Sequence, residues 1–335
     1  MEKRNLSMLP FSVLDLAVVT EGTTIPDTFA KSLDLAQHVE KLGYKRFWLA
    51  EHHNMINVAS SATSVLIGYI AGGTTNIRVG SGGIMLPNHS PLIIAEQFGT
   101  LTSLYPGRID LGLGRAPGTD QLTAYAIRGN RFNATNDFPQ DIQQLQSYFS
   151  KENSSAKVRA IPGEGSEIPI WILGSSTDSA HLAGMLGLPY AFASHFAPAQ
   201  FHSAINIYRE TFKPSVHWQK PYVMACVNVI AADTDTEANI LASSLFQMFK
   251  GIATGNRTYL QPPVEKMEAW TEYEEALVNQ MLALSFIGGP ETIKKNMQQF
   301  LNDTQIDEVM LTSNIYDHKA RLYSFELFAD ILKSS

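Results

Sequence analysis

The chain has 335 residues, 44% of them hydrophobic and 17% charged, so it can bury a large core as one domain or as two of ordinary size. A formal net charge of −7 without any cluster of Lys and Arg argues against a nucleic-acid or anionic-membrane partner. The single cysteine, Cys226, excludes an internal disulfide framework and fits a reducing cytosol, and its apolar neighbours predict a buried structural thiol.

The N-terminal segment is not expected to direct secretion, because residues 1–7 are polar and no apolar core follows them. Residues 58–77 carry no charge over a bilayer-spanning length, yet they include several Ser, Thr and Gly residues. We interpret this stretch as a buried helix with its turn. The sequence therefore predicts a cytoplasmic protein without a membrane span.

Short apolar or β-branched runs alternate with longer segments of helical periodicity, a pattern typical of parallel β-α units. Pro26 and Pro91 stand at early helical positions, and Gly43 ends the first helix. Strands are predicted at residues 12–19, 46–50, 78–85, 109–112, 170–173, 190–193, 223–231 and 308–312. Helices are predicted to include residues 92–104, 135–148, 180–187, 234–249, 271–286 and 317–332.

Eight strand-helix units favour a (β/α)8 TIM barrel over a doubly wound sheet, which has fewer strands. We therefore expect residues 1–335 to form a single barrel domain. Two segments exceed the minimal barrel, namely residues 151–167 and residues 251–289. The second is an insertion after strand seven, on the face where barrel active sites form, so it is predicted to be a lid or a substrate wall.

Residues just past the ends of parallel strands converge on one mouth of such a barrel. The following residues occupy these positions: His52 and His53, Pro87-Asn88-His89, Gly114-Arg115, Gly174-Ser175-Ser176, and Ser194-His195.

The adjacent histidines His52 and His53 follow Glu51 at the end of a predicted strand. Neighbouring side chains on a strand point to opposite faces, so the pair is poorly placed to chelate one ion, and no His-Glu-x-x-His helix is present. No metal site is predicted. We expect one histidine to face the mouth as an acid, base or hydrogen-bonding group while the other packs behind it.

Small residues at 174–176 precede a predicted helix, where free backbone N–H groups and hydroxyls form an anion seat. Ordinary helix capping uses the same residues, but Arg115 can add a guanidinium, which favours phosphate binding. The strand at 78–85 carries Gly82 and Gly83, so a flat or bulky ligand is expected against its backbone. Neither glycine group is a dinucleotide fingerprint, so reducing equivalents are expected from outside the chain.

These residues resemble the bacterial luciferase-like flavin monooxygenase family, in particular its single-chain, non-luminous members. The similarity is dense from residue 14 to about residue 120 and continues more loosely to residue 332. The matching segments are WLAEHH at 48–53, VGSGGIMLP at 79–87, PGRIDLGLGR at 106–115 and PIWILGSS at 169–176.

The resemblance implies a (β/α)8 barrel that binds FMN, or less often the deazaflavin F420, at its C-terminal mouth. His52 matches the catalytic histidine that supports the oxygenated flavin. Gly82-Gly83 matches a position where the family often has a non-prolyl cis peptide against the flavin ring, and Arg115, Ser175 and Ser176 match phosphate-binding positions. The predicted cofactor-binding residues are Gly82, Gly83, Arg115, Gly174, Ser175, Ser176 and Ser194.

The predicted function is an FMN-dependent monooxygenase that uses reduced FMN as co-substrate, with O2, to oxidise a small, apolar organic substrate. A separate flavin reductase and a homodimer are family-level expectations. Gly114 stands where the luciferase large subunit has a reactive cysteine, so light emission is not expected. The alternatives are an F420-dependent reductase on the same barrel, a non-catalytic flavin-binding protein, and a flavin-free lyase or hydrolase that uses Glu51 and Asp110.

Overall fold

A ring of parallel strands forms the centre of the molecule, a computed structural model in which residues 4–129 and 137–334 are described. The strands of the ring are β1 (Phe11–Asp15), β2 (Arg46–Leu49), β3 (Arg78–Met85), β4 (Ile109–Gly114), β5 (Ile170–Gly174), β6 (Tyr190–Phe192), β7 (Val223–Ala231) and β9 (Glu308–Thr312). The ring closes because β6 pairs with β7 and β9 pairs with both β7 and β1. This closure confirms the predicted (β/α)8 barrel.

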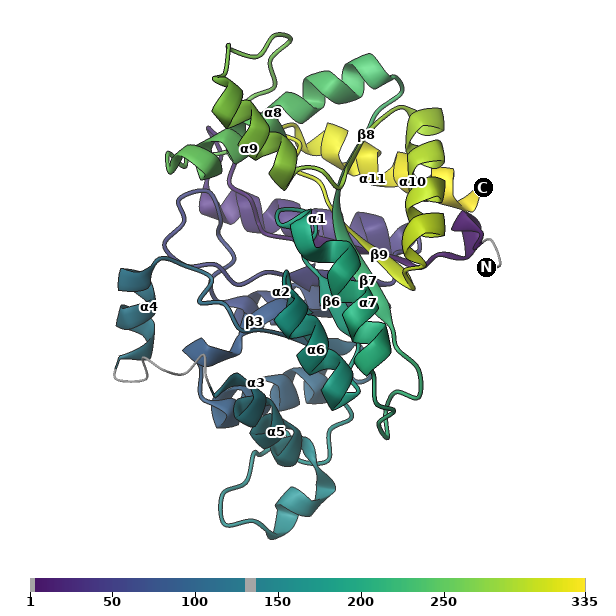
Figure 1. Cartoon of the computed structure of the whole chain (residues 1–335). Helices are drawn as coiled ribbons and strands as arrows, with labels where there is room; N and C mark the ends of the chain where they lie inside the picture. Colours follow the sequence, from purple (N-terminus) through teal and green to yellow (C-terminus); the bar gives the residue numbers. More distant parts are fainter. Residues whose placement is uncertain (1–3, 130–136, 335) are drawn as a thin grey trace.

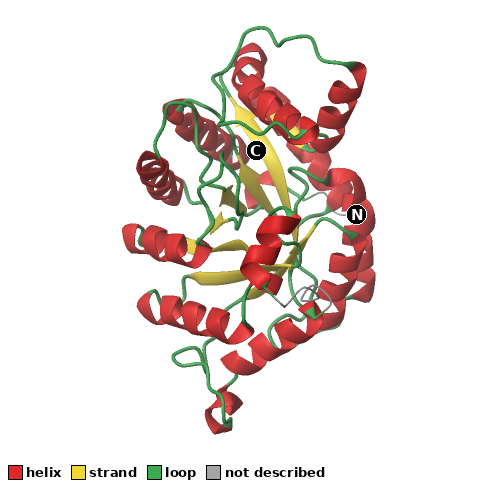
Figure 2. Ribbon diagram, turned by 90° about the vertical axis from the view of Figure 1, so that its left-hand side faces the viewer, coloured by secondary structure: helices red, strands yellow, loops and turns green. Residues whose placement is uncertain are grey.

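Helices surround the ring and cover its outer surface (Figures 1 and 2). The first begins at a capping box in which Thr24 and Asp27 exchange hydrogen bonds. The α-helices are α1 (Ile25–Lys41), α2 (Thr63–Gly73), α3 (Pro91–Leu104), α4 (Gln121–Arg128), α5 (Phe138–Phe149), α6 (Thr177–Leu186), α7 (Phe201–Thr211), α8 (Asp235–Thr254), α9 (Glu272–Met281), α10 (Pro290–Thr304) and α11 (His318–Lys333). Short 3-10 turns are η1 (Leu6–Met8), η2 (Leu86–Asn88), η3 (Lys151–Ser155) and η4 (Pro198–Gln200).

The interior of the barrel is filled by large side chains. Trp48 and Trp171 are fully buried and meet edge to face, with ring centroids 5.3 Å apart. Cys226 lies in the same cluster, and burial raises the pKa of its thiol well above the ordinary value. The expectation of a buried structural thiol is thus confirmed.

A buried ion network closes the amino-terminal end of the barrel. Asp110, the second residue of β4, accepts hydrogen bonds from Arg46 at 2.7 Å and from Arg78 at 2.6 Å. The Arg46 guanidinium also reaches Glu308 at 3.0 Å. Asp110 is therefore paired at the end opposite to Glu51, which follows β2, so the two carboxylates do not form a lyase or hydrolase dyad.

The predicted strand at 12–19 is too long. The structure ends β1 at Asp15, because its carboxylate accepts the Ala17 N–H at 3.1 Å and Ala17 adopts a left-handed φ of 49°. A local side-chain hydrogen bond thus turns the chain before the strand can continue.

The predicted helix at 271–286 is also too long. It ends as α9 at Met281, and β8 (Ser285–Gly288) then adds to the C-terminal part of β7. Side chains along β8 alternate between half-buried and buried positions, as expected of a strand. The predicted start of the 135–148 helix lies outside the described residues, and the described helix α5 begins at Phe138.

The insertion at 251–289 is attached to the loop that follows β1. The Leu260 N–H donates to Val19 at 3.0 Å, and the Leu260 carbonyl accepts from Glu21 at 2.9 Å, so the segment is fixed to the loop after β1. Figure 1 shows α8 and α9 side by side. Over residues 4–129 and 137–334, no helix has the length and apolar character that a membrane span requires.

Candidate active site

The C-terminal mouth brings together His52 after β2, Gly82-Gly83 within β3, Arg115 after β4 and the start of α6 after β5. Parallel neighbours in the ring carry these residues, so the predicted convergence follows from strand order.

The two glycines of β3 leave a strip of bare backbone. Their peptide bond is cis, and the register between β3 and β4 shifts between Ser81 and Ile84. A Cβ atom at Gly82 would lie 2.7 Å from Leu14 Cδ1, and one at Gly83 would lie 2.8 Å from the Gly112 carbonyl oxygen. Neither position accepts a side chain unless its neighbours move, so close packing against Leu14 and against the backbone of β4 already requires glycine at both.

His52 is a half-buried, neutral imidazole. Its Nδ1 lies 3.4 Å from the Gly118 carbonyl oxygen, and Nε2 has no hydrogen-bond partner among the described residues. Burial lowers the pKa of His52, and the positive charge of Arg257 lowers it further. A neutral ring with a free nitrogen can hold or accept a proton at the mouth.

Glu51 binds the second histidine behind the site. Its buried carboxylate contacts His53 Nε2 at 2.9 Å and His89 Nε2 at 2.9 Å, and it accepts the Met85 N–H at 3.0 Å. Burial raises the pKa of Glu51, but the hydrogen bonds from His53 and His89 outweigh burial and lower it to about 2. The carboxylate therefore joins the ends of β2 and β3 and fixes the loop that carries His52.

His195 is a histidine that the sequence placed at the mouth without a role. Its Nδ1 is buried and has no hydrogen-bond partner within the described ranges. Burial lowers the pKa of His195 to about 3, and the field of His52 adds to this effect. Two neutral imidazoles thus share the mouth, a relation between β2 and β6 that no local sequence signal reveals.

The predicted anion seat lies at the start of α6. Ser176 caps the helix, and Arg115 Nη2 lies 3.7 Å from the Asp178 carboxylate in its first turn. Arg115 is 49% exposed, so this pair is weak and the guanidinium is available to a stronger anion. A Cβ at Gly174 would overlap the Ser179 hydroxyl, so glycine permits the close turn.

Ser194 lies in a different environment from the other predicted cofactor residues. It is fully buried, and its hydroxyl donates to the Cys226 carbonyl oxygen at 2.6 Å. The hydroxyl hydrogen is thus already in use, and only oxygen lone pairs remain for a ligand.

A cavity of about 690 Å³, here called the mouth cavity, lies between the insertion and the loops after β1 and β2. Of the aromatic residues in the insertion, Tyr259 and Trp270 line it. Phe286 instead packs on Phe300 with ring centroids 5.4 Å apart, and Tyr273 is 72% exposed. The insertion therefore supplies a substantial part of the wall of this cavity.

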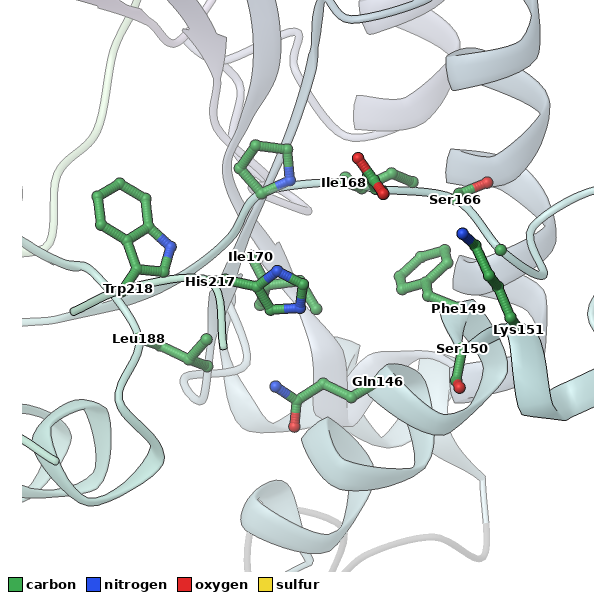
Figure 3. A pocket seen from close by; sticks show the side chains of 13 residues that line it. Gln146, Phe149, Ser150, Lys151, Ser166, Ile168, Ile170, Leu188, His217 and Trp218 are labelled. Atoms are coloured by element: carbon green, nitrogen blue, oxygen red, sulfur yellow. The ribbon is translucent and has the colours of Figure 1, made fainter. Parts of the chain in front are cut away.

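A second cavity of about 460 Å³ opens at the amino-terminal end of β5 (Figure 3). Phe149, Ile168 and Trp218 line it, together with Lys151 and His217. It lies beside the start of β5, at the end of the barrel opposite to the strand ends that carry the predicted site residues, so it is separate from the mouth. Within the described residues, no group of three or more His, Cys, Asp or Glu side chains is arranged to hold a metal ion.

The profile of the luciferase-like monooxygenase family matches residues 9–308. A luciferase-like monooxygenase of Escherichia coli K12 is 51% identical over 324 residues, which are 96% of this chain and 97% of that protein. The N-acetyl-S-alkylcysteine monooxygenase of Bacillus subtilis is 41% identical over 190 residues, which are 56% of this chain and 57% of that protein.

Among solved structures, apo-MsnO8 superposes with a TM-score of 0.88 at 32% identity and covers 98% of this chain and 99% of its own. The similarity therefore extends over nearly the full length in sequence and in fold. The chain belongs to the luciferase-like monooxygenase family of flavin-dependent oxidoreductases.

Proposed function

We propose that this protein uses reduced FMN and O2 to oxygenate a small organic substrate at the C-terminal mouth. The observation that carries the proposal is the bare Gly82-Gly83 backbone, with His52 on one neighbouring strand end and Arg115 on the other. Bound reduced FMN would supply two electrons, so that one oxygen atom of O2 enters the substrate and the other leaves as water.

Arg115 and the first turn of α6 would hold the phosphate of FMN. The N–H groups at a helix start lack intrahelical partners, and the helix dipole favours an anion there. Ser175 and Ser176 add hydroxyls at this end, while Gly174 allows the backbone to turn closely. Ser194 is given no contact with the phosphate, because it is fully buried and its hydroxyl hydrogen is bound to the Cys226 carbonyl oxygen.

His52 would hold a proton next to the reacting oxygen. Its neutral ring offers Nε2 as donor or acceptor, and burial keeps it from becoming an imidazolium at neutral pH. The insertion at 251–289 would act as a wall or lid that limits water at the mouth.

The reducing equivalents are proposed to come from a separate flavin reductase, since the sequence lacks a dinucleotide fingerprint. Reduced flavin would then enter from solvent and bind at the mouth.

The test is a titration of the purified protein with FMN, riboflavin and F420, followed by O2 uptake with reduced FMN and a panel of aldehydes, ketones and thioethers. We expect FMN to bind more tightly than riboflavin, and one panel member to increase O2 uptake with formation of oxygenated product. Preferential binding of F420 together with anaerobic hydride transfer would replace the proposal by the reductase alternative. FMN binding without substrate-dependent O2 uptake would indicate a non-catalytic flavin-binding protein.

A further inference from the structure

We infer that the mouth cavity binds an anionic group of the substrate, a carboxylate in the first instance, through Arg257. This inference rests on the proposed function for its chemistry, but the binding itself is testable in its absence. It changes the expected substrate from a purely apolar molecule to an amphiphilic acid.

Arg257 is a free cation in the cavity wall. Its guanidinium makes no hydrogen bond or ion pair with another described residue. Lys250, which also lines the cavity, is already engaged, because its ammonium lies 3.8 Å from the Glu274 carboxylate and 5.7 Å from the centre of the Trp270 ring. Lys266, Glu21 and Glu268 complete the charged lining.

Arg257 belongs to the segment that Leu260 fixes to the loop after β1, and its charge acts on His52. The charge of Arg257 has a larger effect on the pKa of His52 than the charge of Glu51 has, although Glu51 is next to His52 in the chain. A carboxylate held by Arg257 would therefore leave the rest of a small substrate within reach of the imidazole. A guanidinium suits this task because it binds a carboxylate with two parallel hydrogen bonds.

This anion site is distinct from the phosphate seat. Arg115 and the start of α6 lie after β4 and β5, and none of these residues lines the mouth cavity. The cavity instead lies over the loops after β1 and β2, which contribute Glu21 and Ile56. FMN and substrate would thus have separate cationic contacts, Arg115 for the phosphate and Arg257 for the carboxylate.

The remaining lining selects an apolar body for the same substrate. Ile56, Met267, Tyr259 and Trp270 surround the cavity, and its volume of about 690 Å³ is suited to a molecule of this size. An N-acyl thioether amino acid combines a free carboxylate, an apolar arm and an oxidisable sulfur. N-Acetyl-S-benzylcysteine is therefore the probe, and its carboxamide is the matched neutral probe.

The experiment is calorimetric titration of both probes into the protein, with and without oxidised FMN. We expect the carboxylate to bind at least about tenfold more tightly than the carboxamide, because a charge-assisted pair is replaced by a neutral one. Arg257→Gln is expected to remove this preference, and Arg257→Lys to retain part of it. Lys266→Gln, a cation in the same wall, is the matched control and is expected to keep the preference.

The inference is overturned if neither probe binds, or if both bind equally tightly to the unmodified protein. It is also overturned if the preference for the carboxylate survives in Arg257→Gln. Its failure differs from failure of the proposed function. In the latter case FMN does not bind or O2 uptake does not respond to any substrate, while the carboxylate preference is still measured on the flavin-free protein.

Discussion

The imidazole of His52 is the side chain on which the proposed chemistry most depends. Replacement by Ala removes the free nitrogen at the mouth but leaves Arg115 and α6 unchanged. We expect FMN affinity to stay within several-fold, while the fraction of consumed O2 released as hydrogen peroxide rises. The hydrogen peroxide formed per O2 consumed is measured in the presence of substrate. His181→Ala, which replaces an exposed histidine, is the control. An unchanged yield would remove His52 from the mechanism.

Glu51 is expected to contribute to stability as well as to position. Glu51→Gln weakens the hydrogen bonds from His53 and His89, and we expect a loss of about 2 kcal/mol in the free energy of unfolding at pH 7. Urea unfolding measures the loss, and Glu167→Gln, an exposed carboxylate, provides the matched control. Equal midpoints for both variants would contradict a stabilising role of Glu51.

The stabilising effect of Glu51 should also depend on pH. Its folded-state pKa of about 2 lies below the ordinary value of 4.5, so its contribution is present above pH 4.5 and is lost as the pH falls toward 2. The difference in unfolding free energy between the native chain and Glu51→Gln should therefore shrink over this interval. A difference that stays constant down to pH 2.5 would contradict the low pKa.

The paired strands β3 and β4 impose a different constraint at each glycine. A Cβ at Gly82 meets the end of the Leu14 side chain, whereas one at Gly83 meets the backbone of Gly112. We therefore expect Gly83→Ala to destabilise the fold by about 1–3 kcal/mol and Gly82→Ala by less. Thermal unfolding of the two variants decides the order, and a larger loss for Gly82→Ala would contradict it.

The start of α6 and the end of β4 together predict how the flavin phosphate is recognised. Arg115→Gln removes the cation but keeps the capping hydrogen bonds of Ser176. We expect FMN affinity to fall by about tenfold or more and riboflavin affinity to remain unchanged. Fluorescence titration with both flavins measures the change. If both affinities fall together, Arg115 does not bind the phosphate.

For the whole molecule, the order and hand of the barrel follow from alternating strand and helix signals. All strands of the ring are found where the periodicity predicts them, because each is a short apolar run between turn residues. The errors arise where local contacts override periodicity, as with the Asp15 carboxylate that ends β1. The addition of β8 to β7 was missed because such an edge pairing is a tertiary event.

The candidate site was predictable to the extent that strand ends meet at one mouth. His52, Arg115 and Ser176 could be placed at the mouth in this way, whereas Gly82 and Gly83 lie within β3 and stand out only by their missing side chains. His195 and Arg257 interact electrostatically with His52 across distant segments of the chain, so no spacing in the sequence reveals these relations. The network around Glu51 depends on His89, which lies on the neighbouring strand end.

The most direct test of the central claim is a crystal structure of the protein with FMN. The account predicts the isoalloxazine ring against the Gly82-Gly83 backbone, the phosphate within hydrogen-bond distance of Arg115 and the first turn of α6, and His52 beside the ring. Flavin bound in the cavity near Trp218 at the opposite end of the barrel, or a phosphate that leaves Arg115 paired with Asp178, would contradict it.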